Sequence, residues 1–162
     1  MDAFFKQRTG HTERWVLNSP ATRNALTDAT VEAMLEACNA AFTDPELRFI
    51  VLTGSGGSFC AGGSLGSFSR LIGQPLAVGE VDPLIALNQR FGDLLNALSA
   101  LPQILIAAVD GPAMGGGLGL LGVQLSALQH ELSRRAVTQT PPHEGRNLRR
   151  HQTQRDFWRG KS

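Results

Sequence analysis

The segment Ile104–Val123, ILIAAVDGPAMGGGLGLLGV, constrains the fold more than any other part of the chain. It opens with a short apolar run, Ile104–Val109, which predicts a buried strand. Asp110–Pro112 interrupts the run, and three glycines, Gly115–Gly117, precede an apolar stretch. Because glycine loses more backbone entropy on ordering than any other residue, three in a row indicate that something approaches the backbone closely.

Two interpretations of this segment remain open from its sequence. A strand, a glycine-rich turn and a helix start leave backbone N–H groups pointing outward, with the positive end of a helix dipole behind them. Such a corner binds a partially negative oxygen. The other interpretation is a tight turn in which helix and sheet pack closely, and the segment alone does not decide between them.

A second corner of the same kind lies earlier in the chain. Arg48–Thr53 predicts a buried strand, Gly54–Gly57 predicts a turn, and SFCAGGSLGSF, residues 58–68, again indicates a glycine-rich loop and a helix start. The chain therefore has two strand-to-helix corners, one after Thr53 and one after Val109.

Helices are predicted between these strands. Thr27 and Asp28 suit the start of a helix whose apolar residues follow the 3.6-residue period up to Pro45. Asp82-Pro83 starts a second helix, which Pro102 ends, after a loop over residues 69–82. Its apolar face comprises Leu84, Leu87, Phe91, Leu94, Leu95 and Leu98. With a hairpin within residues 3–17, this order predicts the α/β class with a parallel, right-handed βαβ unit.

Charge divides the 162-residue chain into two parts. Residues 1–123 carry 7 basic and 11 acidic side chains, a net charge of −4, whereas residues 124–162 carry 8 basic and 3 acidic ones, a net charge of +5. The second part is rich in Arg, Gln, Thr and His and has few aliphatic residues. We therefore expect a folded domain over residues 1–123 and an atypical, poorly ordered basic tail over residues 124–162.

Composition also bears on compartment and partners. Cys38 and Cys60 do not form a disulfide framework, and Cys38 lies on a predicted apolar helix stripe, which indicates a buried structural thiol. The N-terminus has no apolar signal core, and Pro102 and Asp110 argue against a membrane helix over Leu101–Val123. We expect a cytoplasmic protein with no membrane partner. The basic tail lacks a nucleic-acid-binding module, and no residues have metal-ligand spacing, so neither nucleic acid nor a metal is expected.

Gly62–Gly66 matches the G-x-S-x-G pattern of serine hydrolases. The nucleophile of such an enzyme directly follows its strand, whereas Ser64 lies about ten residues after the predicted one. The only histidines that follow it belong to the atypical tail. The sequence therefore favours Ser64 as a helix N-cap rather than as a nucleophile.

Three segments together carry a family resemblance: RWVLNSPATRNALT, FIVLTGSGGSFCAGGSL and ILIAAVDGPAMGGGLGL. Their order and spacing over residues 13–123 resemble the enoyl-CoA hydratase/isomerase (crotonase) family. The resemblance implies a fold of repeated ββα units, related to ClpP and truncated here. It also implies an acyl-CoA thioester as substrate, coenzyme A entering only as part of that substrate, and a homo-oligomer, in this family a trimer.

The resemblance also implies roles for individual residues. Two peptide N–H groups, here those of Gly63 and Gly116, would hold the thioester oxygen as it becomes an enolate. Substrate-binding positions follow from the same motifs, with Arg23 placed to meet a phosphate. These positions are Arg23, Ala25, Ala61, Ser64, Leu65 and Met114.

The chain departs from the family pattern at the proton-transfer positions. Hydratases of the family carry a glutamate where this chain has Gly119, and the second glutamate would lie where the resemblance has ended. Neither Glu131 nor Glu144 has a matching context, and Glu80 and Asp82 are unassigned alternatives. Two functions therefore remain for the domain: an enoyl-CoA hydratase/isomerase-like enzyme, and an acyl-CoA-binding or interaction protein without proton-transfer groups. A third, weaker alternative is a nucleic-acid binder that uses the basic tail.

Overall fold

The computed structural model describes residues 2–64, 66, 69, 79 and 82–123. All of them belong to a unit that spans Met1–His130. The predicted basic tail over residues 124–162 lies outside the described residues, as does most of the loop predicted over residues 69–82.

The chain begins with the predicted hairpin. Strand β1 (Phe4–Thr9) pairs antiparallel with β2 (Thr12–Leu17), so that Thr9 lies opposite Thr12. Gly10, with φ of 58°, makes the turn together with His11. A short 3-10 helix, η1 (Pro20–Thr22), follows the hairpin.

Helix α1 (Asp28–Phe42) starts as its sequence predicts. The Thr27 hydroxyl accepts a hydrogen bond from the Thr30 amide, which satisfies one of the free N–H groups of the first turn. Cys38 is buried on the inner face of the helix, and desolvation raises the pKa of its thiol to about 12. The prediction of an inert, structural thiol at this position is therefore confirmed.

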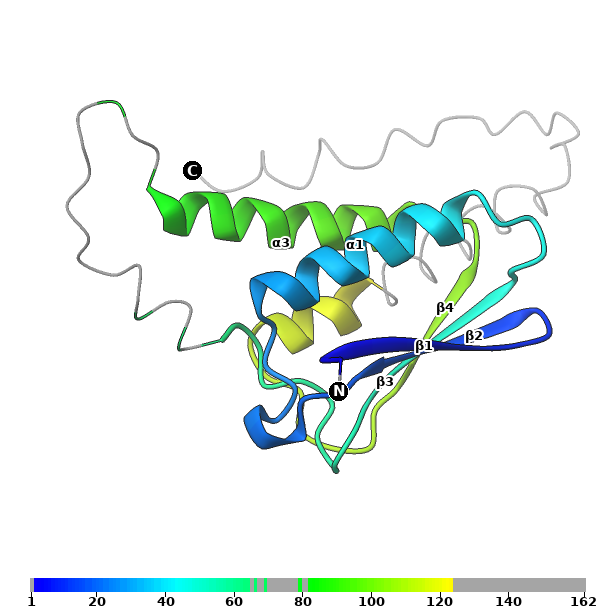
Figure 1. Ribbon diagram of the computed structural model, residues 1–162, viewed down its shortest axis with the longest axis horizontal. Coiled ribbons are helices and arrows are strands. Elements are labelled where there is room, and N and C mark those ends of the chain that lie inside the picture. The colour runs from blue at the N-terminus through cyan, green and yellow to red at the C-terminus, as the bar shows by residue number, and fades with distance from the viewer. Residues whose placement is uncertain (1, 65, 67–68, 70–78, 80–81, 124–162) are drawn as a thin grey trace, which may run out of the picture. The chain divides into compact units, whose positions relative to one another are not determined.

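Two crossovers complete a four-stranded sheet in the order β1-β2-β3-β4. β3 (Phe49–Gly54) is parallel to β2, and β4 (Ile104–Ala108), which follows α3 (Pro83–Ser99), is parallel to β3. Figure 1 shows α1 and α3 side by side over the same face of the sheet. The predicted parallel βαβ organisation is confirmed, and none of the described helices is both long and apolar enough to cross a membrane.

The hydrophobic core lies between this sheet face and the two helices. Its fully buried members come from the strands, from both helices and from the two glycine-rich corners. The largest are Trp15, Leu17, Ile50, Leu52, Met34, Phe59, Leu94 and Leu120.

The prediction that Ile104–Val109 forms a fully buried strand is wrong about its burial. Ile104 and Ile106 are 56% and 44% exposed, whereas the alternate residues Leu105 and Ala107 pack against the core. β4 ends the order of described strands, and the described helices cover the face opposite Ile104 and Ile106. Burial therefore follows the two-residue alternation of a strand with one covered face.

Candidate functional site

Hydrogen bonds join the two glycine-rich corners. The amides of Phe59 and Cys60 donate to the Pro112 carbonyl at 3.1 and 3.2 Å, and the Met114 amide donates to the Cys60 carbonyl at 2.9 Å. Cys60 and Ala113 form an isolated parallel bridge. The loop after β3 and the loop after β4 therefore run alongside each other where each leaves the sheet.

Gly62, in the loop after β3, and Gly117, in the helix that follows the loop after β4, are required by close packing. Gly62 has φ of 90°, and a β-carbon there would lie 2.8 Å from the Met114 carbonyl oxygen and 3.1 Å from the Gly116 amide nitrogen. A β-carbon on Gly117 would lie 2.7 Å from the Cys60 carbonyl oxygen. The tight-packing interpretation thus accounts for Gly62 and Gly117.

Gly116 has different surroundings. The atoms nearest to a β-carbon there would be side-chain carbons, Phe91 Cζ at 3.2 Å and Leu26 Cδ1 at 3.3 Å. Residues 116–123 are helical, so Gly116 begins a helix, where backbone N–H groups have no partner within the helix. No described residue accepts a hydrogen bond from the Gly116 amide.

A third segment orients Gly63. The Leu26 amide donates to the Gly62 carbonyl at 2.7 Å, and the Ser64 amide donates to the Leu26 carbonyl at 2.9 Å. In a parallel bridge of this form the residue between the two bonds turns its own N–H to the other side. The Gly63 N–H is therefore directed away from Leu26, and no described residue accepts a hydrogen bond from it.

Asn24 fixes this third segment, and sequence reasoning missed it. Asn24 is almost fully buried, and its backbone φ is 58°. The side-chain amide donates to the carbonyls of Ser55 and Ser58 at 2.9 and 2.7 Å, and Oδ1 accepts from the Ser19 amide at 2.8 Å. Asparagine tolerates the left-handed conformation better than most residues. An Asn in a predicted tight loop was therefore the available signal for this position.

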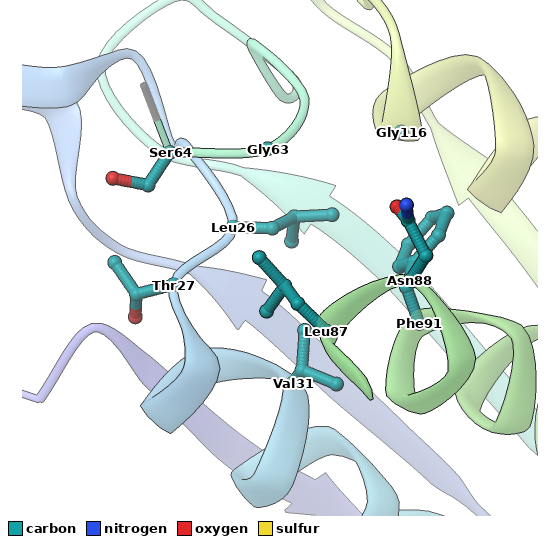
Figure 2. A pocket seen from close by; sticks show the side chains of 9 residues that line it. All are labelled: Leu26, Thr27, Val31, Gly63, Ser64, Leu87, Asn88, Phe91 and Gly116. Carbon is teal, nitrogen blue, oxygen red and sulfur yellow. The ribbon is translucent and has the colours of Figure 1, made fainter. Parts of the chain in front are cut away.

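Gly63 and Gly116 line one cavity of about 240 Å³ (Figure 2). Its walls are mostly apolar, and α1, α3 and the three loops contribute to them. None of the described residues that line it carries a carboxylate, imidazole, thiol or amine. They are Leu26, Thr27, Val31, Gly63, Ser64, Leu87, Asn88, Phe91 and Gly116.

The predicted site residues fall into three groups. Gly63, Gly116 and Ser64 line the cavity, and the Ser64 hydroxyl points away from the two glycines in Figure 2. The cavity lining does not include Arg23, Ala25, Ala61 or Met114, although the Ala61 amide donates to the Arg23 carbonyl at 2.9 Å and so places these loops together. Leu65 lies outside the described residues, and the Ser64 N-cap stays a prediction.

Helix α3 contributes Leu87, Asn88 and Phe91 to the cavity lining. The sequence placed Leu87 and Phe91 on the apolar face of this helix, and of that face only Leu94 and Leu98 are fully buried. Leu87 and Phe91 line the cavity together with Asn88, whose side-chain amide points toward the start of the 116–123 helix in Figure 2. An asparagine on an otherwise apolar stripe was the available signal.

The described candidates for proton transfer do not line the cavity. A β-carbon on Gly119 would meet the Phe91 ring at 3.4 Å and Leu95 Cδ1 at 3.5 Å, so this position faces α3. The Asp82 carboxylate accepts from the Leu84 amide at 2.8 Å and caps α3. Glu80, Glu131 and Glu144 lie outside the described residues.

Comparison with known proteins identifies a family. The family model described as enoyl-CoA hydratase/isomerase matches residues 15–123. Enoyl-CoA hydratase EchA19 of Mycobacterium tuberculosis is 38% identical over 116 residues, which are 71% of this chain and 41% of that protein.

Solved structures agree with this match. The crystal structure of an enoyl-CoA hydratase/isomerase from Marinobacter aquaeolei superposes with a TM-score of 0.70 and 31% identity, over 75% of this chain and 46% of that one. Pseudomonas aeruginosa AtuE gives a TM-score of 0.69 and 33% identity, over 75% and 45%. The chain thus spans less than half the length of these relatives. On its sequence and its fold alike, the chain belongs to the enoyl-CoA hydratase/isomerase (crotonase) family.

Proposed function

We propose that this chain binds acyl-CoA thioesters with the thioester oxygen between the amides of Gly63 and Gly116. One observation carries the proposal: both amides lack a described acceptor, and both residues line the same cavity. Gly116 also begins a helix, whose dipole adds positive potential where an oxygen would gain negative charge.

Such a pair of donors stabilises an enolate more than the neutral thioester. The loss of one oxyanion donor in other enzymes costs about 2.7–4 kcal/mol of transition-state stabilisation. The donors here are backbone groups held by the interlocked loops around Asn24 and Cys60, so they need little reorganisation when charge develops. The proposed activity is therefore of the enoyl-CoA hydratase/isomerase type, which passes through an enolate.

A second candidate function rests on the cavity lining. None of its nine residues can transfer a proton near neutral pH, and Gly119 occupies the position of the family glutamate. A general acid or base typically contributes about 10²–10⁴-fold to rate. A site that retains the two amides without such a group acts as an acyl-CoA-binding protein with weak turnover.

Arg23 is proposed to contact a phosphate of the coenzyme. Its side chain is exposed, and no described residue forms an ion pair with it. The hydrogen bond from the Ala61 amide to its carbonyl places Arg23 next to the loop that carries Gly63. Arg23→Ala should weaken binding of an acyl-CoA more than binding of the same acyl group on a thioester without phosphates.

Homo-oligomer formation and a cytoplasmic location also remain predictions. The exposed isoleucines of β4 supply apolar surface of the kind that oligomers bury. Light scattering after size-exclusion chromatography measures the assembly directly. A monodisperse monomer that melts cooperatively would overturn this expectation.

Two assays on the full chain separate the two candidate functions. Thermal melting with butyryl-CoA tests binding, because a ligand that binds only the folded state raises the midpoint. Hydration of crotonyl-CoA tests turnover. Binding with turnover supports the enzyme, binding with turnover at background supports the binding protein, and no shift with either thioester would refute both.

A further inference from the structure

The ring of Phe91 lies against two glycines of the 116–123 helix. Phe91 Cζ would stand 3.2 Å from a β-carbon on Gly116, and Cε1 and Cζ would each stand 3.4 Å from one on Gly119. Glycine at both positions therefore lets an aromatic ring from α3 approach the helix backbone. The ring lies directly beside the residue whose amide is proposed to bind the thioester oxygen.

The cavity next to this ring is small and apolar. Its volume of about 240 Å³ is below the 300–1,000 Å³ typical of sites for drug-sized ligands. The side chains of Leu26, Val31 and Leu87 form other parts of its wall. An acyl chain that starts between Gly63 and Gly116 therefore has little room before it reaches an aromatic or branched side chain.

The ring of Phe91 also contacts Gly119, which does not line the cavity. Gly119 and Leu95 adjoin each other there, and Leu95 is only partly buried against the core. Truncating the ring would itself open space that extends the existing cavity toward Gly119, and Leu95 would supply part of its apolar wall. Phe91 itself belongs to a regular part of α3, so its place is set by the helix rather than by a loop.

We propose that Phe91 determines acyl-chain length and makes short-chain acyl thioesters the substrate class of this site. The inference rests on the proposed function, because it takes the thioester to lie between the two glycine amides. Phe91 contacts the acyl group rather than the reacting carbonyl, so it is a specificity-determining residue and not a catalytic one.

Calorimetric titration of the full chain with acetyl-, butyryl-, hexanoyl- and octanoyl-CoA tests the proposal. For the unaltered chain we expect affinity to rise up to butyryl-CoA and then to level off or fall. In Phe91→Ala the rise should continue, by about fourfold for each additional buried methylene. Phe91→Leu, which removes less of the core contact, provides the same test if the alanine variant does not fold, with a smaller extension.

Phe42→Ala is the matched control. Phe42 is 59% exposed at the end of α1 and does not line the cavity, so the same substitution there should leave the chain-length profile unchanged. An unaltered chain that gains about fourfold per carbon up to octanoyl-CoA would overturn the inference while leaving the proposed function intact. A failure of every thioester to bind would refute the proposed function itself.

Discussion

A β-carbon on Gly62 would stand 3.1 Å from the amide nitrogen of Gly116. The loop after β3 and the loop after β4, more than 50 residues apart in sequence, are thus in backbone contact beside the cavity. This contact brings the proposed oxyanion donors into one site. The glycines here are of two kinds: some are needed for backbone packing, and others face the cavity.

Alanine substitutions should separate these two kinds of glycine. Gly62 has a positive φ, and Gly62→Ala places a methyl group 2.8 Å from a backbone oxygen. We therefore expect the substitution to destabilise the fold by about 1–3 kcal/mol or more. Gly116→Ala meets only the ends of Phe91 and Leu26, so its unfolding free energy should change by less than about 1 kcal/mol. Urea unfolding of both variants measures the difference.

The Gly116→Ala substitution should affect ligand binding more than stability. The methyl group of Gly116→Ala enters the cavity next to the donor amide, so we expect at least tenfold weaker binding of butyryl-CoA. Gly122→Ala, in the same helix, is the matched control, since its β-carbon would have no described atom within 4 Å outside the helix's own backbone and its chain neighbours. Equal affinities of the two variants would count against a ligand at Gly116.

Asn24 should be one of the most sensitive positions for stability. Asn24→Ala leaves the Ser19 amide and the carbonyls of Ser55 and Ser58 without this partner. Of these bonds the one to Ser58 is buried, and a buried orphan group costs about 1–3 kcal/mol. Asn24→Asp keeps the acceptor for Ser19 but directs a carboxylate oxygen at two carbonyls, so it should also destabilise. Chemical unfolding that changes by less than about 1 kcal/mol in both variants would contradict this role.

The ion pair between α1 and α3 should make stability depend on acid. Hydrogen bonds from the Arg90 guanidinium hold the pKa of Glu32 below its ordinary value of 4.5. The stabilisation is therefore complete above pH 4.5 and is lost as the pH falls through the lower pKa of the folded state. The difference in thermal midpoint between the unaltered chain and Glu32→Gln should be constant from pH 7 to 5 and shrink below.

Glu36→Gln is the control for this pH series. Glu36 is exposed on the same helix, and no described residue forms an ion pair with it. Its substitution should change the midpoint equally little at each pH. A Glu32→Gln difference that stayed the same at pH 7 and pH 3 would show that the ion pair does not contribute to stability.

Introducing a carboxylate at position 119, where the family resemblance implies a glutamate, should raise turnover. Gly119 faces the Phe91 ring at ordinary contact distance, so a longer side chain must extend past that ring toward the cavity. We expect Gly119→Glu to hydrate crotonyl-CoA faster than the isosteric Gly119→Gln, with an upper bound set by the about 10²–10⁴-fold of a general acid or base. Equal rates for the two variants would show that the missing glutamate alone does not limit turnover.

Local signals predicted the parts of the fold that depend on local chemistry. The Thr27 cap, the turn at Gly10 and the parallel pairing of β3 with β4 all follow from residues adjacent in sequence or from the order of elements. The exposure of Ile106 could not be predicted in this way, because a short apolar sequence is compatible with a strand covered on one face or on both.

The site was predictable to a similar extent. Glycine patterns and the family resemblance indicated Gly63 and Gly116, which do line one cavity. Phe91 and Asn88 were missed because a helical apolar face does not reveal where the core ends and a cavity begins. Asn24 was missed because its role depends on carbonyls more than 30 residues away in sequence.

The carbonyl stretching frequency of a bound thioester tests the central claim most directly. With ¹³C-labelled butyryl-CoA, isotope-edited infrared spectroscopy isolates that one bond. We predict a lower frequency for the bound thioester than for the free one, because two N–H donors polarise the carbonyl, and a smaller change in Gly116→Ala. A thioester that binds at the frequency it has in water would contradict the claim that the amides of Gly63 and Gly116 hold its oxygen.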